Sequence, residues 1–217
     1  MVHRFARGEL DPLPDSLRKR RNLPGIDLTY VEGKNVLLLG SGGGQQSAIL
    51  GLLGARVTII ELSRRQLDGD LKAAEHYGYE ICTIHADMQC PSCLNNRSFD
   101  VIFTPATMYL PDVRKIFAEC ARLLRSNGIL SMGLLQPAKQ CRFLTGLLSE
   151  DPYDPDSRNA IKYIHYMDDI FNGLVDAGLS LQRVVDWGRR KLDPPIPVGV
   201  LDPDYIDNCG YFIVVAT

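Results

Sequence analysis

NVLLLGSGGGQQSAILGLLGARVTIIE, residues Asn35–Glu61, is the stretch that decides the fold of this 217-residue chain. It opens with the apolar run Val36–Leu39, which is typical of a strand buried on both faces. A glycine turn over 40–44 follows, and Gln45–Leu53 then has apolar residues at helical spacing. A second strand-like run, Arg56–Ile60, completes the stretch. This order of strand, glycine turn, helix and strand predicts a βαβ unit.

The spacing of the glycines separates two classes of nucleotide site. A dinucleotide site needs G-x-G-x-x-G, so that a pyrophosphate can lie on the helix N-terminus. Here Gly40, Gly42 and Gly44 alternate, and Gln45 stands where the third glycine of that motif would fall. The alternating glycines, followed by Glu61 at the tip of the next strand, resemble motif I of the class I S-adenosylmethionine (SAM) methyltransferases. The competing interpretation is a plain turn with an exposed glutamate.

The resemblance implies roles for residues at the carboxyl ends of the predicted strands. The turn would let the methionine part and the ribose approach the backbone. Glu61 would accept the ribose hydroxyls, because a carboxylate is only an acceptor. Asp87, after a predicted strand over 79–85, would accept the adenine amino group, unless it is a surface residue that begins a loop. In full, the implied SAM pocket consists of Gly40, Ser41, Gly42, Gly44, Gln45, Glu61, Leu62, Gln66, Asp87, Met88 and Thr104.

The alternation of strands and helices continues along the chain. The patterns predict further strands over 79–85, 99–103, 129–135, 181–187 and 211–216, and helices over 64–77, 112–124 and 165–177. Asn127-Gly128 is expected to form a turn before the strand over 129–135. In the helix over 64–77, Leu67, Leu71 and Ala74 are expected to face inward. The last strand returns through a proline-rich connection without a helix, which indicates antiparallel pairing.

These elements predict one domain of α/β class. We expect a Rossmann-like class I methyltransferase fold, with a seven-stranded, mostly parallel sheet, an antiparallel C-terminal strand and helices on both faces. Residues 1–33 are interpreted as an N-terminal extension and candidate lid, and 34–217 as the SAM-dependent methyltransferase domain.

Further blocks resemble small, bacterial-type class I SAM methyltransferases. They include SGGGQQSAILGLLGARVTIIELSRRQLDGD at 41–70, FDVIFTPAT at 99–107 and PDVRKIFAECARLLRSNG at 111–128. The pair Gln45-Gln46 together with the L-S-x-x-Q-L pattern at 62–67 is the most specific part. The segment between Pro137 and His165 is short for this group. Because that segment normally shapes the substrate cavity, the sequence does not define the methyl acceptor.

Methyl transfer from a sulfonium is an in-line displacement, so alignment of the nucleophile carries most of the catalysis. A general base is needed only where the nucleophile must lose a proton. His165 and Tyr109 are the candidate catalytic residues; the alternatives are a structural histidine and a tyrosine that caps the cofactor or steers a substrate. Thr104-Pro105-Ala106 lacks the residues of the N/D-P-P-Y/F loop of nucleic-acid amino-methyltransferases. This favours a small-molecule substrate and no nucleic-acid partner.

Composition gives the remaining expectations. A net charge of −2 and a pI near 6.1 give no general attraction to nucleic acid or acidic lipid, and no run approaches the roughly 18 apolar residues of a membrane span. We expect a cytoplasmic monomer or homodimer with SAM as its cofactor and no metal, since Cys90 and Cys93 form a single C-x-x-C pair. Two other functions remain open: a SAM-fold binding protein without catalysis and, less favoured, an NAD-type oxidoreductase.

Overall fold

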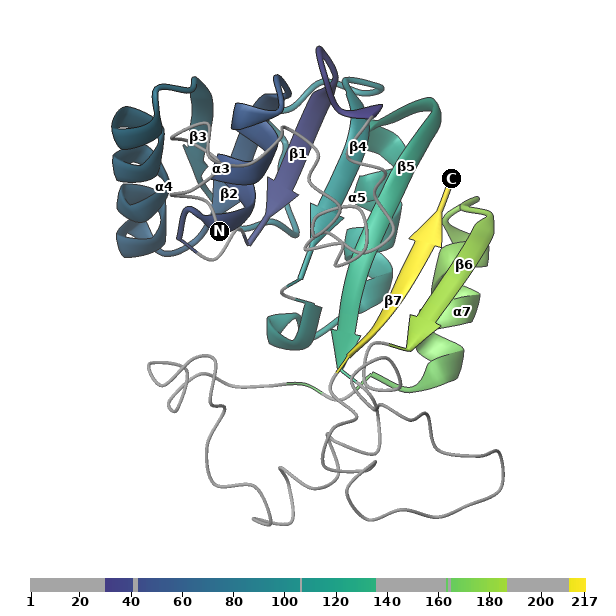
Figure 1. Ribbon diagram of the computed structural model, residues 1–217. Helices are drawn as coiled ribbons and strands as arrows, with labels where there is room; N and C mark the ends of the chain where they lie inside the picture. The colour runs from purple at the N-terminus through teal and green to yellow at the C-terminus, as the bar shows by residue number, and fades with distance from the viewer. Residues whose placement is uncertain (1–29, 41–42, 106, 136–162, 164, 187–210) are drawn as a thin grey trace, which may run out of the picture.

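The computed structural model describes residues 30–40, 43–105, 107–135, 163, 165–186 and 211–217. These residues form one seven-stranded sheet flanked by helices (Figure 1). The strands are β1 (Asn35–Leu39), β2 (Arg56–Glu61), β3 (Ile81–His85), β4 (Phe99–Thr104), β5 (Leu124–Leu135), β6 (Leu181–Asp186) and β7 (Tyr211–Ala216). The helices are α3 (Gln45–Leu52), α4 (Arg64–Tyr77), α5 (Val113–Leu123), α7 (Met167–Asp176) and the 3-10 turn η2 (Thr107–Tyr109).

The sheet has the strand order β3-β2-β1-β4-β5-β7-β6. Strands β1 to β5 pair in parallel, whereas β7 is antiparallel to both of its neighbours, β5 and β6. The predicted fold class is therefore confirmed, including the antiparallel terminal strand. The order reverses direction between β1 and β4, which is where ligands bind in open α/β sheets.

Two hydrophobic layers lie on opposite faces of the sheet. Leu37 and Leu39 of β1 face the layer that contains α5 and α7, and Val36 and Leu38 face the layer that contains α3 and α4. All four side chains are fully buried. The apolar run that opened the sequence is thus a strand covered on both sides, as its composition predicts.

Helix α4 begins and ends where the sequence predicts, and Leu67 and Ala74 are buried on its inner face as expected. Ser63 is the N-cap and its Oγ accepts the Gln66 N–H at 3.4 Å, while Gly78 ends the helix at φ 73°. The expectation that Leu71 faces inward is wrong, because its side chain is 46% exposed. Asp70, one position earlier, is fully buried instead. Its carboxylate has a hydrogen-bonding partner on α3, which an apolar pattern does not reveal.

Strand β5 begins earlier than predicted. The expected turn at Asn127-Gly128 lies inside an irregularity of the β4–β5 pairing, where the register shifts between Phe99 and Val101. Asn127 has a φ of 64°, the left-handed conformation that asparagine tolerates. The predicted turn therefore kinks a continuous strand, as β-bulges do. Residues 1–29, which make up most of the candidate lid, lie outside the described residues. So do residues 136–162, which belong to the segment before His165 that normally shapes the substrate cavity in the resembled group.

Candidate cofactor site

Four neighbouring parallel strands end at one edge of the sheet. The register pairs residues at or next to their ends: Leu39 with Ile60, Glu61 with His85, and Leu38 with Phe103. The glycine turn, Glu61 and the segments that follow β3 and β4 therefore meet at this strand-tip edge (Figure 1). Sites in parallel α/β sheets form at this edge because every strand there delivers the start of a loop.

The described glycines of the turn adopt conformations that side chains disfavour. Gly40, directly after β1, has a φ of 68°, and its N–H donates to the Ile60 carbonyl at 2.9 Å. Gly43 and Gly44 have φ values of 82° and 99°, and Gly44 is the N-cap of α3. Ser41 and Gly42, two more of the predicted pocket residues, lie outside the described residues. The turn therefore offers backbone rather than side chains to a ligand.

Helix α4 packs closely against this turn. A Cβ added to Gly44 would lie 3.0 Å from the Ala73 Cβ and 3.0 Å from the Gly69 carbonyl oxygen, and one added to Gly43 would collide with Gln66 Oε1. Gln66, predicted as a pocket residue, is thus beside the turn. Side chains at these glycines would displace the turn from α4, so the chain fits a ligand that needs close access to the backbone.

The two predicted carboxylates follow neighbouring strands. Glu61 Oε1 accepts the Ser63 N–H at 2.9 Å, and its Oε2 has no hydrogen-bond partner within the described part of the chain. Asp87 is exposed, and its Oδ1 accepts the Gln89 N–H at 2.9 Å. Each carboxylate is therefore oriented by the backbone of the loop that it begins.

The other predicted pocket residues occupy the same edge. Leu62 is exposed, and its carbonyl lies 2.8 Å from His85 Nε2. Met88 is partly buried against the layer of α5 and α7. Gln45 is exposed on the first turn of α3. The structure thus brings together every described residue of the predicted pocket, although they differ in exposure.

Among the described residues, two buried polar atoms, Thr104 Oγ1 and Gln46 Oε1, have no hydrogen-bond partner. An unsatisfied buried polar group costs about 1–3 kcal/mol, so such atoms call for a ligand or a water as partner. Thr104, at the tip of β4, is a predicted pocket residue. Gln46, in the first turn of α3, is not, because the motif drew attention to its neighbour Gln45. The pair Gln45-Gln46 was the feature of the sequence that could have pointed to Gln46.

The loop after β4 is held in place by buried hydrogen bonds. Thr107 Oγ1 donates to the Gly133 carbonyl at 2.7 Å, and His165 Nε2 donates to the Thr107 carbonyl at 3.1 Å. His165 is only 5% exposed, and burial lowers the pKa of its ring, although the Thr107 carbonyl opposes this. Tyr109 is half-buried on η2. The structure therefore connects both candidate catalytic residues to one loop. Tyr109 lies in the loop, and the ring of His165 donates a hydrogen bond to its backbone at Thr107.

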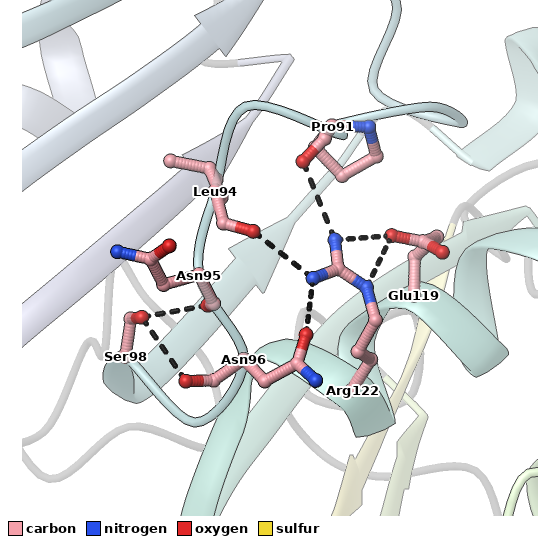
Figure 2. A network of polar contacts seen from close by, with 7 residues as sticks. All are labelled: Pro91, Leu94, Asn95, Asn96, Ser98, Glu119 and Arg122. Atoms are coloured by element: carbon pink, nitrogen blue, oxygen red, sulfur yellow. Dashed lines mark hydrogen bonds and ion pairs between the residues drawn. The ribbon is translucent and has the colours of Figure 1, made fainter.

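Arg122 of α5 organises the loop that leads from β3 to β4, a role that the sequence did not reveal. Its guanidinium donates to the carbonyls of Pro91 and Leu94, to Asn96 Oδ1 and to Glu119 Oε2, as Figure 2 shows.

Within the described residues, no three His, Cys, Asp or Glu side chains are placed to share a metal ion. No helix in the described part of the chain is long and apolar enough to cross a membrane.

Comparisons with known proteins agree with this geometry. A family described as a methyltransferase domain matches residues 37–132. The uncharacterized methyltransferase YbaJ of Bacillus subtilis is 34% identical over 170 residues, which is 68% of this chain and 66% of that protein. The chain thus spans just under two thirds of the length of this relative.

Solved structures share the whole architecture at low sequence identity. A SAM-dependent methyltransferase from Mesorhizobium loti has a TM-score of 0.68 and 20% identity, and covers 95% of this chain and 97% of its own. Geranyl diphosphate C-methyltransferase from Streptomyces coelicolor, solved with geranyl diphosphate and S-adenosylhomocysteine (SAH), has a TM-score of 0.65 and 17% identity, and covers 93% of this chain and 79% of its own. Residues 37–132 thus match a methyltransferase domain, and the sheet topology that the chain shares with these solved structures is the fold of the class I SAM-dependent methyltransferases, enzymes whose cofactor is SAM.

Proposed function

We propose that this protein transfers a methyl group from SAM to an oxygen, nitrogen or carbon atom of a small molecule. The observation that carries the proposal is the register of the strand tips, which brings the glycine turn beside Glu61 and the Asp87 loop. The small-molecule class is supported by the Streptomyces neighbour, whose acceptor is geranyl diphosphate. The T-P-A sequence after β4, which lacks the nucleic-acid amino-methyltransferase loop, supports the same class.

Each group at the edge has a role that suits its chemistry. Glu61 accepts the ribose hydroxyls through its unpaired Oε2, and the exposed Asp87 accepts the adenine amino group. The backbone of the glycine turn and the amide oxygen of Gln46 meet the methionine part, whose ammonium group donates hydrogen bonds. When bound, SAM supplies an electrophilic methyl group on a sulfonium whose charge already activates the leaving group.

The roles of the two candidate catalytic residues differ. Tyr109 lies on η2, directly after the tip of β4, so its phenol is placed to steer or deprotonate an acceptor. His165 is buried and its Nε2 donates to Thr107, so we assign it to positioning the loop rather than to proton transfer. With His165 assigned to positioning, the enzyme acts mainly by alignment, which suits a displacement on a sulfonium.

The test is methyl transfer into separated fractions. SAM labelled on its methyl group is incubated with the protein and with small-molecule, protein or nucleic-acid fractions of a cell extract. We expect label in the small-molecule fraction, and far less with Glu61→Gln. Label in protein or nucleic acid would overturn the substrate class. Label in no fraction, in spite of SAM binding, would instead indicate a binding protein without catalysis.

A thermal-shift measurement separates the cofactor classes independently. SAM or SAH at about 100 times its Kd should stabilise the folded protein by about 2.7 kcal/mol. For a chain of this size, that corresponds to a rise in Tm of roughly 5–11 °C. NADH should leave the Tm unchanged. A rise with NADH alone would restore the oxidoreductase interpretation.

A further inference from the structure

One face of helix α4 forms the surface on which the glycine turn rests. Gln66, Gly69, Asp70 and Ala73 recur at steps of three and four residues, so they share this face, which we call the α4 seat. A Cβ added to Gly69 would lie 3.2 Å from the Gly43 carbonyl oxygen and 3.3 Å from the Gly43 Cα. The backbones of turn and helix therefore touch without an intervening side chain.

A buried hydrogen-bond cluster joins the same face to helix α3. Ser47, the third residue of α3, donates from Oγ to Asp70 Oδ1 at 2.6 Å, and Tyr79 Oη lies 3.2 Å from the same hydroxyl. Ser47 and Asp70 are both fully buried. Burial raises the pKa of Tyr79, so its phenol stays protonated and available as a donor. A short hydroxyl-to-carboxylate bond of this kind is strong and directional.

A buried carboxylate is poorly explained by stability alone. Placing an ionisable group in an interface between two helices costs desolvation, and apolar residues often replace such groups without loss of stability. The next residue on the helix, Leu71, is apolar, and its side chain is exposed to solvent. What the carboxylate does provide is a fixed distance between α4 and the first turn of α3, where the glycine turn ends.

We propose that Asp70 is a positioning residue for SAM binding. Through Ser47 it fixes the first turn of α3, and together with the α4 seat it sets the path of the glycine turn. Because Asp70 and Ser47 are fully buried, both act on the cofactor only through the backbone that they hold. The inference rests on the proposed function of the turn as the cofactor site.

The test compares Asp70→Asn with Asp68→Asn, an exposed aspartate two residues earlier on the same helix. SAH affinity is measured by calorimetry on protein shown to be folded by circular dichroism, and KM for SAM and kcat are measured with whichever fraction accepts methyl groups. Asp70→Asn keeps an acceptor for the Ser47 hydroxyl but removes its charge, so we expect it to weaken SAH binding about tenfold and to raise KM while kcat at saturating SAM changes little. Asp68→Asn should match the wild type.

Two further variants keep the proposal falsifiable if Asp70→Asn does not fold. Ser47→Ala removes the hydroxyl and should weaken SAH binding, whereas Ser47→Thr keeps it and should restore much of the affinity. Folded Asp70→Asn or Ser47→Ala protein that binds SAH as the wild type does would overturn the proposal and leave the proposed function standing. Wild-type protein that binds neither SAM nor SAH would overturn both.

Discussion

Glu61 is the residue at the strand-tip edge that we propose to accept the ribose hydroxyls of the cofactor. Replacing it with glutamine keeps the size of the side chain and one acceptor oxygen but removes the charge. Because a hydrogen bond to a charged group contributes about 1.5–3 kcal/mol, we expect Glu61→Gln to weaken SAH binding roughly 10- to 100-fold. Calorimetry measures this loss. Glu80→Gln, an exposed glutamate near the start of β3, should bind SAH normally, and equal affinities for the two variants would contradict the assigned role.

His165 gives the folded protein a defined dependence on pH. Burial lowers the pKa of the folded ring below the value near 6.5 that an unfolded histidine has. The unfolded state therefore takes up a proton first as the pH falls, so stability decreases below about pH 6.5 and this loss ends below the folded pKa.

The corresponding variant is His165→Gln, whose amide can still donate to the Thr107 carbonyl. Its Tm should be lower than that of the wild type at pH 8, because the fit is imperfect, and should fall less steeply between pH 6.5 and 5. Thermal melts across this range measure both slopes. Parallel slopes for the two proteins would show that the ring titrates as freely in the folded state as in the unfolded state.

At the scale of elements, Arg122 fastens the loop between β3 and β4 onto helix α5 (Figure 2). Arg122→Ala removes its bonds to two carbonyls and an amide, and within the described residues only the Pro91 carbonyl keeps another donor, the Leu94 N–H. We expect a destabilisation of about 2 kcal/mol, or a fall in Tm of roughly 4–8 °C. Chemical denaturation and thermal melts measure these changes.

Arg114→Ala is the matched control on the same helix. Arg114 forms ion pairs with two acids, Asp169 and Asp176. Its side chain is 45% exposed, whereas that of Arg122, which pairs with Glu119, is 28% exposed. Exposed ion pairs contribute little, so this variant should change stability by less than about 1 kcal/mol. A larger effect at Arg114 than at Arg122 would mean that the loop contacts do not stabilise the fold.

Helix α4 shows what a sequence pattern can and cannot predict about an element. Its boundaries followed from Ser63 and Gly78, because caps act through local backbone chemistry. The burial of Leu67 and Ala74 followed from their spacing, but that of Asp70 did not, because its partner Ser47 lies 23 residues away on another helix. The same limit applies to Arg122, because two of its acceptors are the backbone carbonyls of Pro91 and Leu94, which residue types do not reveal.

At the scale of the whole molecule, alternation of strands and helices predicted the sheet and its antiparallel last strand. It also predicted which edge carries the site, since loops after parallel strands meet at one edge. The orphaned amide oxygen of Gln46 and the buried position of His165 could not be predicted, because both depend on packing between elements. Residues 136–162, the segment that normally shapes the substrate cavity in the family that the sequence resembles, lie outside the described residues.

The arrangement of the whole sheet predicts where a bound cofactor slows hydrogen exchange. The tips of β1, β2, β3 and β4 share one edge, whereas β6 lies at the far end of the strand order. SAH should therefore protect the amides around 40–46, 61–66, 85–89 and 104–110, which follow those four strands, and leave those of β6 unchanged. Exchange measured by mass spectrometry with and without SAH tests this pattern. Protection centred on β6, with none after β1 and β2, would place the cofactor elsewhere, because only the β1 and β2 tips carry the glycine turn and Glu61.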